Sequence, residues 1–262
     1  MLKGQTFTVI TGASSGIGAA AAKAFAGRGK NLVLAARRIR NLQTLRDEIS
    51  EAYPALDIIV RTVDLSIPAN AYAFYSSLKD LSLETWINNA GFGNYDTVGR
   101  QDLTVINEML RLNIEALTIL SSLFVRDYYD TPGTQLINIS SCGGYTIVPT
   151  ATTYCASKFY VSAFTEGLAR ELIETGAKMR AKVLAPAATK TEFGRKANHV
   201  QQYDYDKAFS RYHTSREMAS FLLELFDSDF TLGLVDRETF QFRLSTPLFP
   251  YSGGSAHNQT LS

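Results

Sequence analysis

The chain has 262 residues, of which 45% are hydrophobic and 19% charged, and its formal net charge is +1. Such a composition is typical of a globular protein with a large core, and the balanced charge excludes a global basic field for nucleic acid. No uncharged apolar run approaches the roughly 18 residues needed to cross a bilayer, so we expect neither a nucleic-acid partner nor a membrane.

The length suits one large domain, which we assign to residues 1–250, followed by a polar tail at 251–262. An apolar stretch begins at Thr6 and leaves no room for a secretory leader. The two cysteines, Cys142 and Cys155, suit a reducing compartment better than a disulfide scaffold. We therefore expect a cytoplasmic protein.

In chain order, short β-branched runs alternate with segments of helical periodicity. Apolar residues recur at helical spacing at Leu42, Leu45 and Ile49, and Thr214 and Glu217 have the spacing of a capping box ahead of an apolar helix. The β-branched runs predict strands at 6–11, 31–35, 57–63, 85–89, 135–140, 181–185 and 239–244. This alternation predicts an α/β fold, a Rossmann-type doubly wound parallel sheet of about seven strands with helices on both faces.

A glycine-rich turn, TGASSGIG, follows the first predicted strand and opens an alanine-rich helix. A glycine pattern alone often marks only a turn. Here, between a strand and a helix, it lets the backbone approach a pyrophosphate, which binds exposed N–H groups at the helix N-terminus. The turn therefore predicts a dinucleotide site formed by Gly12, Ser14, Ser15, Gly16, Ile17 and Gly18.

The end of the second predicted strand indicates which dinucleotide fits. A carboxylate about 20 residues after the glycines would bind a ribose 2′-hydroxyl and favour NAD(H). The chain has Arg37 and Arg38 there, and two guanidinium groups can pair with a 2′-phosphate. Arginines that begin a helix can also be merely solvated. We favour NADP(H) over NAD(H).

Five motifs in this order resemble the classical short-chain dehydrogenase/reductase (SDR) family. They are TGASSGIG, NNAG at 88–91, Asn113, ISS at 139–141 and YCASK at 154–158, and the resemblance covers residues 6–193. It implies transfer of hydride between a nicotinamide and a carbonyl or secondary alcohol.

The resemblance assigns catalytic roles to Asn113, Ser141, Tyr154 and Lys158. Tyr154 is the proton donor, and Lys158, one helical turn on, lowers the phenol pKa and hydrogen-bonds the nicotinamide ribose. Ser141, with Ser140 as second choice, hydrogen-bonds the substrate oxygen. Asn113 holds a water in a proton relay that reaches the lysine.

The same resemblance extends the cofactor site. Its further contacts are Asp64 and Leu65 at the adenine, Asn89, Ala90 and Gly91 near the adenosine ribose, and Pro186, Thr189 and Thr191 at the nicotinamide end, beside Tyr154 and Lys158. One motif differs from the family pattern, because Ala187 occupies a position where the family commonly has glycine. Alanine adopts positive φ less freely, which puts the geometry at the carboxamide in doubt.

Residues 190–215 match the segment with which the family covers its substrate. Aromatic residues there, together with Phe92, Tyr95 and Tyr145, suggest a partly apolar substrate, although aromatic packing on the body of the protein explains them equally well. His199, His213 and His257 lack metal-ligand spacing, so no metal is expected.

We therefore expect an NADP(H)-dependent carbonyl reductase or alcohol dehydrogenase that acts on a small molecule. The alternative is a regulatory protein of the same fold that binds NADPH and turns nothing over, but a sensor does not need the complete set of catalytic residues. The family resemblance further implies a homodimer or homotetramer. Fold alone does not select the substrate.

Overall fold

The structure is a computed structural model that describes residues 5–253. Its centre is an eight-stranded sheet in the order β10-β9-β6-β5-β4-β1-β2-β3. Its strands are β1 (Thr6–Thr11), β2 (Asn31–Ala36), β3 (Ile58–Thr62), β4 (Ser82–Asn88), β5 (Gln135–Ile139), β6 (Arg180–Ala185), β9 (Leu232–Val235) and β10 (Phe242–Ser245). All pairs are parallel except β9 with β10. The predicted α/β fold is confirmed, with eight strands where about seven were expected.

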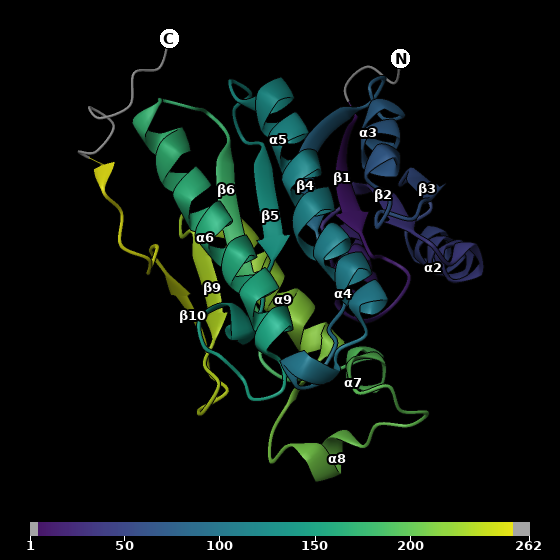
Figure 1. The fold of residues 1–262 in the computed structure, drawn as a ribbon. Helices are drawn as coiled ribbons and strands as arrows, with labels where there is room; N and C mark the ends of the chain where they lie inside the picture. The colour runs from purple at the N-terminus through teal and green to yellow at the C-terminus, as the bar shows by residue number, and fades with distance from the viewer. Residues whose placement is uncertain (1–4, 254–262) are drawn as a thin grey trace.

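Helices cover both faces of the sheet (Figure 1). They are α1 (Gly16–Ala26), α2 (Ile39–Ala52), α3 (Pro68–Ser76), α4 (Leu103–Leu110), α5 (Leu117–Tyr128), α6 (Thr152–Glu174) and α9 (Ser215–Asp227). The short helices α7 (Phe193–Ala197) and α8 (Tyr205–Ala208) lie beyond the carboxyl ends of the strands, near a two-stranded ribbon of β7 (Thr189–Lys190) and β8 (His213–Thr214).

Alternation along the strands divides the core into two layers. Ile10 and Ile87 pack with α1, α2 and α9 on one face, whereas their neighbours Val9 and Trp86 pack with α3, α5 and α6 on the other. Because adjacent residues of a strand point to opposite faces, a strand covered on both sides is mostly apolar on both faces. This accounts for the mostly hydrophobic runs in the sequence.

Local sequence signals decide where two of the helices lie. The predicted periodicity of α2 is confirmed, because Leu42, Leu45 and Ile49 are its buried residues. The predicted capping box of α9 is also present, with the Thr214 hydroxyl and the Glu217 carboxylate each bonded to the other residue's backbone N–H.

The C-terminal strands differ from the prediction. The predicted strand at 239–244 begins only at Phe242, because the Asp236 carboxylate accepts the N–H groups of Glu238 and Thr239 and holds that stretch in a turn. Strand β9, at 232–235, was not predicted, since its four residues follow an amphipathic helix after only residues 228–231 and resemble its continuation.

The chain after β10 runs back along α6. The buried Glu166 carboxylate accepts the backbone N–H groups of Leu248 and Phe249, and the Tyr251 hydroxyl donates to Glu174 at 2.6 Å. The start of the predicted polar tail is thus held against α6. The rest of that tail, 254–262 with His257, lies outside the described residues.

Candidate active site

A cavity of about 730 Å3 lies at the carboxyl ends of the parallel strands. Strand β1 pairs with β2 on one side and β4 on the other, so the chain reverses direction across the sheet at β1. Ligands of open α/β sheets bind beside such a reversal. Fourteen of the predicted site residues line the cavity: Gly12, Ser15, Gly16, Ile17, Arg37, Asn89, Ala90, Gly91, Ser141, Tyr154, Lys158, Pro186, Thr189 and Thr191.

The remaining predicted residues lie behind or beside the residues that line the cavity. Leu65 is buried in the core under α3 rather than at the cavity surface. Asp64 lines a neighbouring cavity of about 410 Å3, and Arg37 belongs to the linings of both. Gly18, Arg38 and Asn113 contact lining residues, and Ser14 accepts hydrogen bonds from Arg38, as described below.

The glycine turn is built for close backbone approach. Gly12 adopts φ +67°, and a Cβ on it would lie 2.8 Å from the Cα of Ala90. A Cβ on Gly18 would lie 2.5 Å from the Asn89 Nδ2, which itself donates to the carbonyl of Thr11. Larger side chains would separate the turn from β4, so the glycines form the compact cradle that a pyrophosphate requires.

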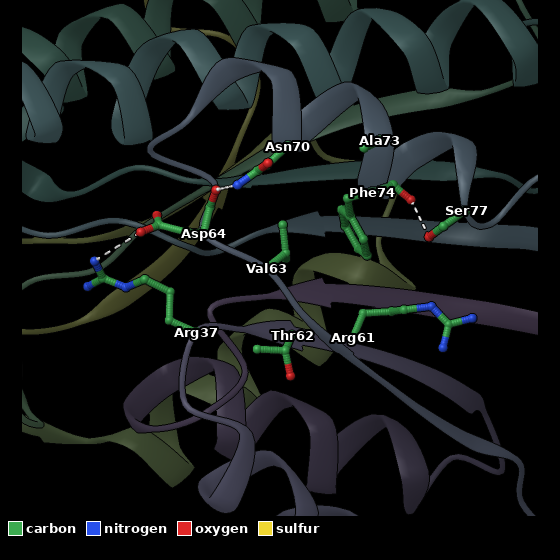
Figure 2. Close-up of a pocket in the computed structure, with 9 residues that line it drawn as sticks. All are labelled: Arg37, Arg61, Thr62, Val63, Asp64, Asn70, Ala73, Phe74 and Ser77. Carbon is green, nitrogen blue, oxygen red and sulfur yellow. Dashed lines mark hydrogen bonds and ion pairs between the residues drawn. The ribbon is translucent and has the colours of Figure 1, made fainter.

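The two arginines differ in what they contact. Figure 2 shows Arg37 reaching toward Asp64, with 3.8 Å between the guanidinium Nη1 and the carboxylate Oδ2. Burial raises the pKa of Asp64, but hydrogen bonds from Ser66 and the nearby Arg37 charge lower it, and the net shift is downward. Arg38 instead donates to the hydroxyls of Ser14 and Ser15, on the glycine turn.

Tyr154 lies in an aromatic enclosure on α6. Its ring packs against those of Tyr95 and Phe193, with centroid distances of 5.9 and 5.4 Å. Burial raises the pKa of this phenol well above its ordinary value of 10.0, and a hydrogen bond with the Ser141 side chain only partly opposes the shift. We expected Lys158 to lower this pKa, but the net shift is upward because burial of the phenol dominates.

Lys158 is buried one helical turn beyond Tyr154. Its Nζ donates to the carbonyl of Ile139 at 2.9 Å and lies 6.0 Å from the centroid of the Tyr154 ring. Burial lowers the pKa of this ammonium group from 10.5 to about 8. At neutral pH the group therefore remains mostly protonated beside the phenol.

Asn113 is held in a π-helical segment (Arg111–Ala116) between α4 and α5. Its side chain accepts the N–H of Phe92 at 3.1 Å and donates to the Phe92 carbonyl at 2.9 Å and to the Ser157 hydroxyl at 3.1 Å. A π-helical turn inserts a residue and re-aims its neighbours. Asn113 thus fixes the loop after β4 to the helix that carries Tyr154.

Both candidate serines line the cavity, but their hydroxyls have different partners. The Ser141 hydroxyl accepts the N–H of Gly143 at 3.0 Å. The Ser140 hydroxyl instead donates to the Lys158 carbonyl and pairs with Ser162, both on α6. Ser141 is therefore the serine whose hydroxyl is available to a substrate oxygen.

The loop after β6 lines the cavity on the side that meets the glycine turn. Ala187 does not have positive φ, so the replacement of glycine introduces no backbone strain there. Thr191 packs against the glycine turn, since a Cβ on Gly16 would lie 3.1 Å from its Cγ2. The turn and this loop therefore contact each other at this end of the cavity.

Aromatic residues line the other end of the cavity. They are Phe92, Tyr95, Phe193, Tyr203, Tyr205, Phe209 and Phe240. Tyr145, also expected there, is not among the lining residues: its hydroxyl donates to Glu166 at 2.6 Å and its ring stacks on Phe249. The predicted covering segment, 190–215, thus supplies four of these aromatic side chains, and its aromatic residues pack on the cavity rather than only on the body.

Several lining residues were not among the predicted site residues, and they include Glu192, which lies within the predicted covering segment, Arg237 and Phe240. Glu192 separates Thr191 from Phe193, and its cavity position depends on the loop's path. Arg237 and Phe240 reach the cavity from the turn between β9 and β10. No sequence signal identified them, because β9 itself was not predicted.

Two further expectations concern metals and membranes. Among residues 5–253, no group of His, Cys, Asp and Glu side chains is arranged to hold a metal ion. Within the same range, no helix combines the length and the apolar character that a bilayer crossing requires.

The arrangement suits a dinucleotide with a substrate at its end. The cavity volume falls within the range of about 300–1,000 Å3 that is typical of cofactor sites. One end has a glycine cradle and arginines for phosphates, and the other has a protonated phenol, a serine hydroxyl and an ammonium group within an aromatic enclosure. Such groups can donate a proton to a carbonyl oxygen as it gains negative charge.

Comparison with known proteins agrees with this geometry. A model of the short chain dehydrogenase family matches residues 6–202. Dehydrogenase/reductase SDR family member 11 of Homo sapiens is 33% identical over 78% of this chain and 80% of its own length. A short-chain dehydrogenase from Sphingobium yanoikuyae, solved in complex with NADPH, superposes with a TM-score of 0.77 at 30% identity, over 85% of this chain and 84% of the other.

A bulky-bulky ketone specific alcohol dehydrogenase from Comamonas testosteroni superposes with a TM-score of 0.71 at 27% identity. The match covers 87% of this chain and 84% of that one.

Proposed function

The chain belongs to the short-chain dehydrogenase family and is an oxidoreductase, and on this premise we propose that it reduces a carbonyl compound with NADPH, or oxidises the matching secondary alcohol with NADP+. The bound cofactor supplies or accepts the hydride at nicotinamide C4. The observation that carries the proposal is the position of Tyr154, Lys158 and Ser141 on one cavity with the glycine turn.

Different groups of residues would bind different parts of the cofactor. The backbone of the glycine turn would bind the pyrophosphate, and Arg37 and Arg38 would bind the 2′-phosphate. Asp64, Asn89, Ala90 and Gly91 would contact the adenosine, with Leu65 supporting them from the core. Pro186, Thr189 and Thr191 would position the nicotinamide end. The NADPH complex of the Sphingobium relative supports this choice of dinucleotide.

The raised pKa of Tyr154 suits the reductive direction. A phenol that stays protonated at neutral pH can donate its proton to the substrate oxygen as hydride arrives. Ser141 hydrogen-bonds the same oxygen, and the Lys158 ammonium stabilises the phenolate that remains. Asn113 keeps the loop of Phe92 in place beside them.

The aromatic end of the cavity favours a ketone with apolar substituents. Seven aromatic side chains besides Tyr154 line the cavity, and two of them, Tyr95 and Phe193, pack against its ring. Flat apolar walls with few polar groups bind apolar ligands and orient them through those few groups. The Comamonas relative, whose structure names it as specific for bulky-bulky ketones, supports this substrate class.

We further propose that the protein acts in the cytoplasm as a homodimer or homotetramer. The reducing compartment agrees with the free thiols of Cys142 and Cys155. Family resemblance is the basis of the oligomeric state.

The proposal is tested by two measurements on the purified protein. NADPH and NADH are titrated by fluorescence with wild type and Arg38→Ala, and NADPH oxidation is followed with a panel of aryl and bulky alkyl ketones. We expect NADPH to bind more tightly than NADH, with most of the preference lost in the variant, and at least one ketone to be reduced. NADPH binding without turnover on the whole panel would favour a regulatory, NADPH-sensing protein. Tighter binding of NADH would contradict the role of the arginines.

A further inference from the structure

An ion pair joins Arg38, which follows β2 and hydrogen-bonds the glycine turn, to the loop that covers the cavity. The Arg38 Nη1 donates to the Glu192 Oε2 at 2.7 Å, although the two residues are 154 positions apart in the sequence. Lys196, one turn along α7, also contacts this oxygen at 3.2 Å. Glu192 itself lines the cavity. The pair therefore lies at the edge of the cavity, beside the glycine turn.

The donors of Arg38 are already engaged. While Nη1 binds Glu192, Nη2 donates to the Ser15 hydroxyl at 2.6 Å and to that of Ser14 at 3.2 Å, and Nε also donates to Ser14. A guanidinium group has five N–H donors in a fixed plane. A phosphate that binds Arg38 in bidentate fashion must therefore displace at least one of these partners.

Glu192 is the partner that a phosphate displaces. The serine hydroxyls are neutral and can donate to a phosphate as well as accept from Arg38. Glu192 is anionic, and burial, which alone raises its pKa, is outweighed by hydrogen bonds from Arg38 and Lys196, so that its pKa falls to about 2. A carboxylate and a phosphate of charge about −2 repel each other at the same guanidinium.

The residue next to Glu192 occupies the catalytic end. The Phe193 ring lies 5.4 Å from that of Tyr154 and 6.2 Å from that of Tyr95. It also fills the space beside Gly93, where an added Cβ would lie 2.6 Å from its Cζ. Thr191, on the other side, packs on Gly16. Three consecutive residues thus touch the glycine turn, Arg38 and the catalytic phenol.

We propose that Glu192 is a specificity-determining residue that competes with the 2′-phosphate of NADP(H) for Arg38, and that its displacement moves Phe193 away from Tyr154. The inference rests on the proposed function, because it takes a phosphorylated dinucleotide as the ligand. It predicts that the 2′-phosphate does more than add affinity. Binding of the 2′-phosphate opens the substrate end of the cavity. NADH, which lacks this phosphate, leaves Phe193 against Tyr154.

The first test isolates the 2′-phosphate with probes that have no nicotinamide. Adenosine 2′,5′-bisphosphate and adenosine 5′-monophosphate are titrated by calorimetry into the full-length wild type, Glu192→Gln and Glu108→Gln. Glu108 is the matched control, because it also contributes a carboxylate to the cavity, and no contact with Arg38 involves it. We expect Glu192→Gln to raise the ratio of the two affinities about tenfold, and Glu108→Gln to leave it unchanged.

The outcomes separate this inference from the proposed function. A wild type that prefers the bisphosphate, with an unchanged or smaller preference in Glu192→Gln, would overturn the competition but keep the NADP(H) assignment. A preference that appears only in Glu192→Gln would support the competition and contradict the assignment. No preference in any variant would overturn both.

The second test follows Phe193 directly. In Phe193→Trp the new indole lies against Tyr154, while the chain's own Trp86 is fully buried in the core and gives a constant background. We expect the bisphosphate, but not the monophosphate, to shift the emission to longer wavelength as the indole moves into water. The same substitution combined with Glu192→Gln should show the shift before any probe is added. Equal responses to the two probes would overturn the coupling.

Discussion

Replacing Asn113 with alanine should destabilise the protein and weaken cofactor binding together. The side chain is buried and makes three hydrogen bonds, two with the backbone of Phe92 and one with Ser157. Its removal leaves those groups without their partner, at roughly 1 kcal/mol each because the Phe92 groups are only partly buried. We expect a loss of about 3 kcal/mol in the free energy of unfolding, which corresponds to a melting temperature about 6–12 °C lower.

Thermal unfolding followed by circular dichroism measures the stability, and fluorescence titration measures NADPH affinity. Asn107→Ala is the control, because Asn107 lies on the exposed surface of α4, and its substitution should change stability by less than about 0.5 kcal/mol. A melting temperature of Asn113→Ala within about 2 °C of wild type would refute the reasoning, since it would mean that the Phe92 loop holds its position without the asparagine.

Three further predictions concern stability. Lys182→Met should lower the free energy of unfolding by about 2–4 kcal/mol, because the buried Lys182 ammonium donates to three carbonyls at the end of α9. Replacing the exposed Lys178 with methionine should change it little, and urea unfolding measures both variants. Burial lowers the pKa of Lys158 and of Lys182 to about 8, so the unfolded chain binds more protons above that pH. The free energy of unfolding should therefore rise from pH about 8 to about 10, by up to roughly 1.4 kcal/mol per pH unit for each lysine, and a flat urea-denaturation profile would contradict this. Glu166→Gln should weaken the hold on residues 246–251, seen as faster proteolysis there; cleavage no faster than in wild type would contradict the role of its carboxylate.

Local patterns were sufficient to predict most of the sheet and the glycine turn at its edge. Strands β1, β2 and β5 lie where apolar runs predicted them, because a strand covered on both faces is mostly apolar along its length. The glycine turn was recognisable because strand, glycine spacing and helix are contiguous. The family identified from five motifs is confirmed over residues 6–202.

Contacts between distant segments were not predictable in this way. The ion pair of Arg38 with Glu192 depends on the path of the loop after β6, which no periodicity specifies. Arg237 and Phe240 reach the cavity only because β10 turns back on β9. The pKa of Tyr154 also depends on tertiary structure: spacing placed Lys158 near the phenol, but burial of the ring, which packs against Tyr95 and Phe193, raises the pKa.

The central claim is that Tyr154 donates the proton in a reduction by NADPH. The most direct test compares wild type, Tyr154→Phe and Tyr160→Phe in single-turnover oxidation of NADPH with a ketone that the wild type reduces. Tyr160 is the control, since it lies on the same helix with its hydroxyl bonded to Thr118. We predict that Tyr154→Phe binds NADPH within about twofold of wild type but reacts at least about 10²-fold more slowly, while Tyr160→Phe reacts normally. A rate in Tyr154→Phe within about tenfold of wild type would contradict the account.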